Sequence, residues 1–262
     1  MDLGLKGRRA LVLSSSRGLG LGVAEALAAE GADVMLCGRS EAALAEAAKA
    51  INARGVGRAT CHVADLASED FSATVASEAL NRFDCVDILV NNSGGPPPGT
   101  AAGMDVYMLE RQAQMMVFRL IELAGLLLPA MRQEKWGRIL TIASSGVVQP
   151  IPNLALSNTL RSALVGWTKT LASEVAADGV TCNMLLPGRI QTDRVDELDD
   201  AAAKRTGKPL EHVRAAARAA IPAGRYGTVE EFASVAAFLC SQPASYVTGS
   251  VIRCDGGAIK SV

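Results

Sequence analysis

Short apolar runs alternate along the chain with longer Ala-rich stretches, and this alternation predicts the fold. The runs lie at 10–13, 33–37, 59–63, 86–91, 138–143, 180–186 and 250–254. Their nearly continuous apolar character indicates strands that are buried on both faces. The stretches between them are of helical type and lie near 18–30, 40–53, 68–83, 104–128, 155–177 and 228–241. Because strands and helices alternate, we expect an α/β fold with a three-layer, doubly wound parallel sheet of about seven strands.

The alternation of strands and helices also indicates the domain organisation. No linker or low-complexity segment divides the 262 residues, so we expect a single domain over 1–262. One stretch, about 191–222, is polar and charged around Gly207 and Pro209 and breaks the alternation. We expect it to form a helical lid over a substrate site, because lids are drawn from such segments. A plain surface excursion is the alternative.

Composition and charge narrow the class of protein. The chain is 49% hydrophobic and has a formal net charge of −1. A near-neutral balance gives no electrostatic reason to expect a nucleic-acid or acidic-membrane partner. The first residues, MDLGLKGRR, contain no apolar signal core, and the apolar stretches look shorter than a membrane span. We therefore expect a soluble, cytoplasmic protein that acts on a small molecule.

The cysteines and histidines do not suggest a metal site. None of the six cysteines is spaced as a zinc or redox pair, so we expect buried, reduced thiols. The two histidines, His62 and His212, lie in a strand-like run and in a charged helical stretch. We expect neither metal binding nor a Ser–His pair.

A glycine-rich loop follows the first predicted strand. In a doubly wound sheet, ligands bind at the carboxyl ends of the strands. The stretch SSSRGLGLG (14–22) places glycines at the start of a helix, where backbone N–H groups and the helix dipole favour a pyrophosphate. The dinucleotide contacts expected here are Ser14, Ser16, Arg17, Gly18, Leu19 and Gly20. A tight packing turn between strand and helix is the alternative.

The end of the second strand indicates which dinucleotide binds. The stretch CGRS (37–40) lacks the Asp or Glu that would bind a free ribose 2′-hydroxyl. It offers Arg39 instead, and Arg17 is expected to point to the same place. Two guanidinium groups suit a 2′-phosphate, which favours NADP(H) over NAD(H). The alternative is that Arg39 is only a solvated residue at a helix start.

Three further loops lie at the same edge of the predicted sheet. VADL (63–66) offers Asp65 and Leu66 to the adenine, and NNSGGPPPG (91–99) is a rigid wall of small residues beside the ribose. LLPGRIQTDR (185–194) ends the sixth strand, and its threonine is placed to bond a carboxamide. The contacts expected from the last two loops are Asn92, Ser93, Gly94, Pro187, Gly188, Ile190 and Thr192. Each loop taken singly also reads as an ordinary turn or cap.

The helical stretch LALSNTLRSALVGWTKTLA (154–172) places Ser157 and Arg161 four residues apart, on one face. A serine hydroxyl is a poor acid, and a protein arginine keeps its proton. These side chains can donate hydrogen bonds to a carbonyl oxygen, and Asn158 is a further candidate donor. The set predicts an oxyanion pocket rather than an acid–base relay.

These loops also carry a family likeness. The matching stretches are SSSRGLG, NNSGG, RILTIASS, GWTKTLASEVA, GVTCNMLLPGRIQTD and IPAGRYGTVEEFASVAAFLCSQPASYVTGSVIRCDGG. Over essentially its whole length the sequence resembles the short-chain dehydrogenases/reductases, in particular the bacterial 3-oxoacyl carrier-protein reductase-like branch. The resemblance implies a Rossmann-type single domain, a nicotinamide cofactor, hydride transfer to or from a carbonyl, and a homotetramer. The helices near 104–128 and 155–177 would then pair across a twofold axis.

The departures from the family pattern concern the chemistry. Its glycine loop begins Thr-Gly, where this chain has Leu13 and Ser14. Its catalytic set is Asn, Ser, Tyr and Lys. By resemblance these places fall near Met116 and on Ser144, Ser157 and Arg161, so only the serine is kept.

Three functions remain open at this point. The leading hypothesis is an NADP(H)-dependent oxidoreductase of a carbonyl or secondary alcohol, with a 3-oxoacyl thioester as one candidate substrate. In it Ser144, Ser157 and Arg161 are the catalytic residues, and Arg161 also keeps the lysine's contact with the nicotinamide ribose. Tyr107 is a substitute acid from another element, or an ordinary half-buried aromatic. The alternatives are a cofactor-binding protein without redox activity, acting as a sensor or assembly subunit, and a lyase or isomerase in which Arg161 stabilises an enolate.

Overall fold

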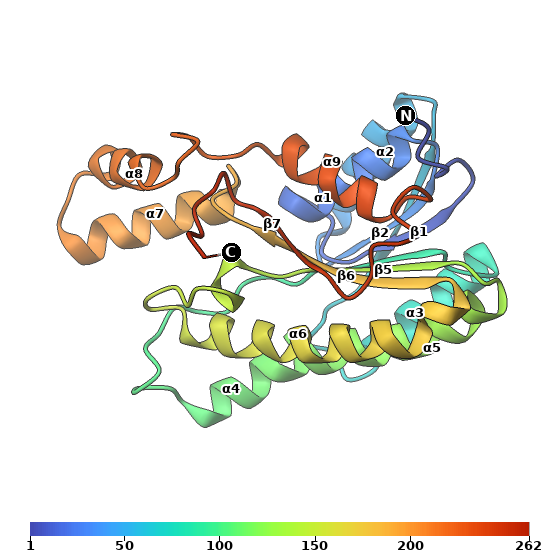
Figure 1. Ribbon diagram of the computed structural model, residues 1–262, viewed down its shortest axis with the longest axis horizontal. Coiled ribbons are helices and arrows are strands. Elements are labelled where there is room, and N and C mark those ends of the chain that lie inside the picture. The colour runs from blue at the N-terminus through green and yellow to red at the C-terminus, as the bar shows by residue number, and fades with distance from the viewer. Residues whose placement is uncertain (262) are drawn as a thin grey trace.

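The computed structural model describes residues 1–261 and contains one seven-stranded parallel sheet between two layers of helices (Figure 1). The strands lie in the order β3-β2-β1-β4-β5-β6-β7. Their bounds are Arg9–Val12 (β1), Asp33–Gly38 (β2), Arg58–Val63 (β3), Ile88–Asn91 (β4), Gly137–Ile142 (β5), Val180–Pro187 (β6) and Val251–Cys254 (β7). The predicted doubly wound sheet is confirmed, and every predicted strand is present to within two residues at either end.

Each face of the sheet is covered by its own group of helices (Figure 1). On one face lie α1 (Gly18–Ala29), α2 (Glu41–Ala53) and α9 (Val229–Leu239). The other face carries α3 (Phe71–Phe83), α4 (Val106–Ala113), α5 (Arg119–Gln133) and α6 (Ala155–Val175). Strand residues point alternately into the two cores, so that Leu11 packs on one side and Val12 on the other. Burial on both faces explains why the five inner strands read as continuous apolar runs, whereas the edge strands β3 and β7 are partly exposed.

The predicted helix near 104–128 is a longer composite. A π-helical turn, η1 (Gln114–Phe118), joins α4 to α5, and the helical stretch runs from Val106 to Gln133. Its best 18-residue window has a mean hydropathy of 1.5, so by length and composition this helix is long enough to cross a bilayer. The prediction that no apolar stretch approaches a membrane span was therefore wrong. Leu123 and Leu127 of α5 are fully buried in the core, and a core helix of this kind passes the same test.

The polar segment at 191–222 forms two helices, as expected. They are α7 (Asp193–Thr206) and α8 (Leu210–Ala219), and the left-handed Gly207 ends the first. Figure 1 shows both at the edge of the sheet where α6 begins, standing out from the body. The carboxylate of Asp199 is completely buried and pairs with Arg189, while Tyr226 Oη donates to it at 2.8 Å. This contact fixes the middle of α7 to the loop after β6.

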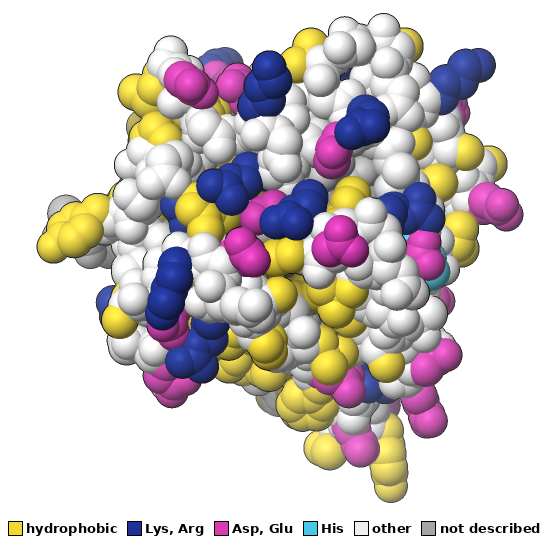
Figure 2. Space-filling model, turned by 90° about the vertical axis from the view of Figure 1, so that its right-hand side faces the viewer, with side chains coloured by type: hydrophobic (Ala, Val, Ile, Leu, Met, Phe, Trp, Pro, Cys, Tyr) yellow, Lys and Arg dark blue, Asp and Glu magenta, His cyan; other side chains and the backbone are white. Residues whose placement is uncertain are grey.

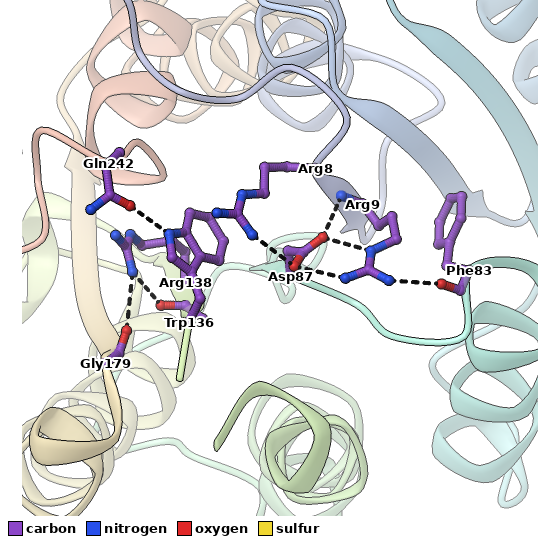
Figure 3. A network of polar contacts seen from close by, with 9 residues as sticks. Arg8, Arg9, Phe83, Asp87, Trp136, Arg138, Gly179 and Gln242 are labelled. Carbon is purple, nitrogen blue, oxygen red and sulfur yellow. Dashed lines mark hydrogen bonds and ion pairs between the residues drawn. The ribbon is translucent and has the colours of Figure 1, made fainter. Parts of the chain in front are cut away.

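The opposite edge of the sheet holds a polar network that sequence reasoning did not anticipate (Figure 3). Asp87, only 1% exposed, accepts hydrogen bonds from both Arg8 and Arg9. The ring of Trp136 lies between two guanidinium carbons, 3.8 Å from that of Arg8 and 4.2 Å from that of Arg138. Figure 2 shows this end of the molecule, where Lys and Arg side chains are interspersed with Asp and Glu. A surface of mixed sign agrees with the near-neutral net charge.

The cysteines are free thiols, as predicted, but two of them are only partly buried. Cys37, Cys85, Cys182 and Cys240 are buried, whereas Cys61 and Cys254 are intermediate. Burial raises the pKa of Cys37, Cys182 and Cys240 to about 12. Within residues 1–261, no group of three or more His, Cys, Asp and Glu side chains is arranged to hold a metal ion.

Candidate active site

The loop after β1 leaves the start of α1 open. Leu13 is completely buried in the core, so its side chain does not fill the groove above the loop. Ser14 and Gly18 both have positive φ, of 48° and 59°, which turns the chain sharply into the helix. The first turn of α1 has no side-chain cap and no acidic residue. Its N–H groups and dipole are therefore available to an anion, as a pyrophosphate requires.

The other two glycines of this loop serve packing. A Cβ on Gly20 would lie 2.4 Å from the Ser14 carbonyl oxygen, and one on Gly22 would lie 2.2 Å from Cγ1 of Val229 in α9. Gly20 allows the loop to close against the helix, and Gly22 allows α1 to approach α9. The packing interpretation of the glycine motif thus holds for Gly20 and Gly22, and the dinucleotide interpretation stays a prediction.

Of the two arginines expected at the 2′-phosphate, Arg17 is engaged by the predicted lid. Arg17 Nη1 is 3.0 Å from Oδ2 of Asp193, the first residue of α7, and the two side chains are 71% and 70% exposed. The expectation that Arg17 points toward Arg39 is wrong for this conformation, because the carboxylate of Asp193 draws it toward α7. Arg39 is exposed and lines a hollow of about 410 Å³ together with Asp65 and Ser68.

The residues beside this hollow have defined local roles. Asp65 Oδ1 accepts from the Ala67 N–H at 3.0 Å, and Leu66 packs against the core. Ser16 lies over Gly38, and a Cβ on Gly38 would lie 3.6 Å from Ser16 Oγ. Gly38 therefore keeps the space between the first two strand ends narrow but open.

The wall after β4 is tied to the glycine loop. Asn92 Nδ2 donates to the Ser14 carbonyl at 3.3 Å, so the two loops hold each other in place. Ser93 is 8% exposed, and its carbonyl faces α6. Gly94 is exposed, and a Cβ there would meet nothing within 4 Å. This loop presents a smooth surface to whatever lies between it and α1.

The loop after β6 is shaped by close packing. A Cβ on Gly188, which follows Pro187, would lie 2.6 Å from the Asp255 Cα. Ile190 is buried and bridges to Gly227. Thr192 Oγ1 donates to the Ile190 carbonyl at 3.3 Å. In this conformation the hydroxyl proton closes its own loop, while the oxygen can still accept from a carboxamide.

Ser157 and Arg161 are both buried, each 7% exposed, on the face of α6 that is turned to the strand ends. Arg161 Nη1 donates to the Ile142 carbonyl at 3.0 Å and Nη2 to the Ser93 carbonyl at 3.3 Å. Burial, reinforced by the positive charge of Arg194, lowers the pKa of Arg161 to about 10, so it remains a cation at neutral pH. Ser144 Oγ accepts from the Gly146 N–H at 3.1 Å, which orients it at the end of β5. A fixed cation and two hydroxyls thus come from adjacent elements.

Three other residues considered from the sequence have different roles. The Asn158 side chain bonds the backbone of Ile151 at both ends, at 3.0 and 3.3 Å, so it holds the preceding loop and is not a free donor. Tyr107 is 84% exposed at the start of α4 and is not half-buried. Met116 is 2% exposed within the π-helical turn and brings no polar group.

Sequence reasoning missed Arg194. Its Nη2 donates to the Pro96 carbonyl at 3.1 Å, and its guanidinium lies over Gly95. It belongs to the stretch LLPGRIQTDR, directly after Thr192 and Asp193. The signal was the charge of that stretch, which in the sequence reads only as the surface of a lid.

Comparison with known proteins agrees with this architecture. A family model described as enoyl-(acyl carrier protein) reductase matches residues 13–258. The chain is 35% identical to the 3-oxoacyl-[acyl-carrier-protein] reductase FabG of Aquifex aeolicus, covering 98% of this chain and 99% of that protein. It is 34% identical to the D-beta-hydroxybutyrate dehydrogenase of Cupriavidus necator, covering 97% and 98%.

A solved structure extends the likeness to three dimensions. The L-sorbose reductase of Gluconobacter frateurii, solved with NADPH and L-sorbose, superposes with a TM-score of 0.94 at 32% identity, covering both chains completely. The resemblance drawn from the strand-end motifs is confirmed over the full length. The chain belongs to the short-chain dehydrogenase/reductase family.

Proposed function

We propose that this protein is an NADP(H)-dependent oxidoreductase that transfers a hydride between the nicotinamide and a carbonyl or secondary alcohol. The observation that carries the proposal is the open N-terminus of α1 at the strand ends, with Arg39 and no carboxylate at the end of β2. The relatives named above are reductases and a dehydrogenase, and the sorbose reductase was solved with NADPH. When bound, the dihydronicotinamide supplies the hydride.

Different residues at the strand ends bind different parts of the cofactor. Backbone N–H groups at Gly18, Leu19 and Gly20 bind the pyrophosphate, and Ser14 and Ser16 line the same turn. Arg39 binds the 2′-phosphate, joined by Arg17 once it leaves Asp193. The remaining contacts are Asp65 and Leu66 at the adenine, Asn92, Ser93, Gly94 and Arg161 along the ribose, and Pro187, Gly188, Ile190 and Thr192 at the nicotinamide.

The catalytic contribution of this site is electrostatic. Ser144 and Ser157 donate hydrogen bonds to the carbonyl oxygen, and Arg161 holds a positive charge close to the charge that develops there. Arg161 does not deliver the proton, because a guanidinium keeps its protons and both of its terminal nitrogens donate to backbone carbonyls. A water molecule admitted beside Ser157 supplies it.

Magnitudes indicate what this replacement costs. A positioned general acid is worth about 10²–10⁴ in rate, or roughly 3–5 kcal/mol of barrier. Orientation of the reactants is worth roughly 7–11 kcal/mol and is untouched by the change. We therefore expect a reductase that is slower than relatives with tyrosine and lysine, but still active.

The proposal also covers the lid, the assembly, the location and the substrate of the enzyme. The pair α7–α8 forms the lid over the substrate, because Arg17–Asp193 and Arg194–Pro96 connect its first turn to two cofactor loops. Phe118 and Leu126, 50% and 45% exposed, leave an apolar outer face on η1 and α5 that suits pairing with a second copy, in a homotetramer. A cytoplasmic location and a 3-oxoacyl thioester substrate are taken from the relatives.

The test combines binding and turnover. NADPH fluorescence should respond saturably to the protein, with NADH binding at least tenfold more weakly. A panel of aldehydes, ketones and 3-oxoacyl thioesters should consume NADPH. The double variant Ser157→Tyr with Arg161→Lys should raise the rate, whereas Ser173→Tyr, on an exposed face of the same helix, should not. No saturable binding of either coenzyme would refute the proposal.

The missing tyrosine and lysine favour one other candidate, an NADP(H)-binding protein without redox activity. It predicts tight NADPH binding, no turnover across the panel, and no change in affinity after Ser144→Ala or Ser157→Ala. A lyase or isomerase using Arg161 would instead form product without consuming the coenzyme.

A further inference from the structure

Arg161 is a buried cation without a counter-ion. Among residues 1–261, no carboxylate lies within 4 Å of it, and its hydrogen bonds go only to the carbonyls of Ile142 and Ser93. A buried charge is costly unless it is paired or well solvated by the protein. The chain therefore maintains an uncompensated positive charge at the floor of the site.

The protein contains an internal comparison for this observation. Arg138, at the other edge of the sheet, is also buried without a carboxylate, at 1% exposure. It donates to the carbonyls of Gly137, Gly179 and Ser241, and its guanidinium lies over the ring of Trp136 (Figure 3). Arg138 is thus enclosed by structural partners, whereas Arg161 has fewer partners and lies where a ligand is expected. The charge of Arg161 is available to a ligand.

A second cation faces the same place from the lid. Arg194 Nη2 donates to the Pro96 carbonyl, and Arg161 Nη2 donates to the Ser93 carbonyl, so both guanidinium groups hold one short segment of the wall. Arg194 comes from above, in the first turn of α7, and Arg161 from below, in α6. Their mutual repulsion contributes to the lowered pKa of Arg161.

The acidic residues nearby do not cancel this charge. Glu197 Oε2 lies 3.1 Å from Arg194 Nη1, but the two side chains are 54% and 43% exposed, and such pairs are worth little. Asp193 is paired with Arg17, on the side of the glycine loop. Arg161 thus has no acidic partner among the described residues, and Arg194 has only an exposed one.

We propose that the substrate of this site carries a carboxylate as well as its carbonyl, and that Arg194 is the residue that binds this carboxylate. The inference rests on the proposed function and adds the substrate class, an oxo acid or the corresponding hydroxy acid. Ser157 and Arg161 hold the carbonyl oxygen, and Arg194 grips the carboxylate with its planar fork of donors. A neutral ketone would leave Arg161 without an anion and Arg194 with only its exposed pair to Glu197.

Calorimetry with a dead-end complex tests this without turnover. NADP⁺ is titrated first, and the saturated protein is then titrated with pyruvate, acetoacetate and levulinate, and with the methyl ester of each. The oxidised coenzyme cannot reduce them, so only binding is measured. We expect at least one acid to bind at least tenfold more tightly than its ester.

Two variants locate the effect. Arg194→Gln should reduce the preference for acid over ester to less than threefold, with NADP⁺ affinity unchanged. The control is Arg205→Gln, an equal change of charge in the same exposed helix, about 16 Å further along at 1.5 Å per residue. It should keep the preference.

The outcomes separate the two proposals. Absence of NADP⁺ binding refutes the proposed function, and this inference with it. NADP⁺ binding with no acid preferred over its ester, or with neither form bound, overturns the inference alone. An equal loss in both variants would mean a diffuse charge effect and would also overturn the role of Arg194.

Discussion

The carboxylate of Asp87 gives the sharpest test of how the amino-terminal ends of the strands are held together. It accepts hydrogen bonds from the Arg9 backbone N–H at 2.8 Å, from Arg9 Nε and Nη2 at 2.7 and 3.0 Å, and from Arg8 Nη1 at 3.3 Å (Figure 3). Asp87→Asn keeps the shape but removes the charge and turns one acceptor into a donor. The backbone of β1 and two arginines then face an amide.

The size of the effect follows from burial. Breaking a fully buried ion pair costs about 3–5 kcal/mol. The side chains of Arg8 and Arg9 are 32% and 29% exposed, so water can recover part of this. We therefore expect Asp87→Asn to lower the free energy of unfolding by about 2–4 kcal/mol, or a Tm loss of roughly 4–16 °C at about 2–4 °C per kcal/mol.

The assay is urea unfolding followed by circular dichroism at fixed protein concentration. The matched control is Asp33→Asn, which breaks only the exposed pair with Arg58, whose side chain is 83% exposed, and should cost less than about 1 kcal/mol. NADPH affinity should not change, because the network lies at the amino-terminal ends of the strands and the candidate site lies at their carboxyl ends. The reasoning is refuted if the two variants lose equal stability.

Three further predictions follow from single contacts. Gly22→Ala should cost about 1–3 kcal/mol of stability in thermal denaturation, because its Cβ would lie 2.2 Å from Val229 Cγ1; an unchanged Tm would mean that α1 and α9 can separate freely. Asp193→Asn should release Arg17 and tighten NADPH binding up to about fivefold, as an exposed pair is worth under about 1 kcal/mol, with NADH unaffected; weaker NADPH binding would contradict the competition. In the native protein a thiol reagent at pH 8 should modify Cys61 and Cys254 well before Cys37, Cys182 and Cys240, whose pKa is raised from 9.0 to about 12. As the pH rises, these three thiols ionise in the unfolded chain before they ionise in the folded protein. Their contribution to the free energy of unfolding is therefore present below pH 9 and is lost between pH 9 and 12.

The fold was predictable because the strands are short and apolar, and the five inner strands are buried on both faces, whereas the edge strands β3 and β7 are partly exposed. Local patterning also placed the strand-end loops correctly. It could not show the direction in which long polar side chains turn. Arg17 bonds a residue 176 positions away, and Asn158 bonds the loop that precedes its own helix.

For the candidate site, too, the sequence predicted which residues lie together on an element but not the partners of their side chains. Spacing alone put Ser157 and Arg161 on one helical face, but their burial and the carbonyl partners of Arg161 come from strands distant in sequence. Arg194 looked like one of several surface charges in a polar segment. Only the fold shows that the wall after β4 passes beneath it, since that contact joins positions 98 residues apart.

The buried Asp199 has a consequence for engineering this enzyme. Its ties to Arg189 and Tyr226 fix the centre of α7, so the helix does not depend on its first turn for its position. Residues 193 and 194 can then be substituted without moving the rest of α7. A library confined to those two positions would retune what the pocket accepts while sparing the scaffold that carries it.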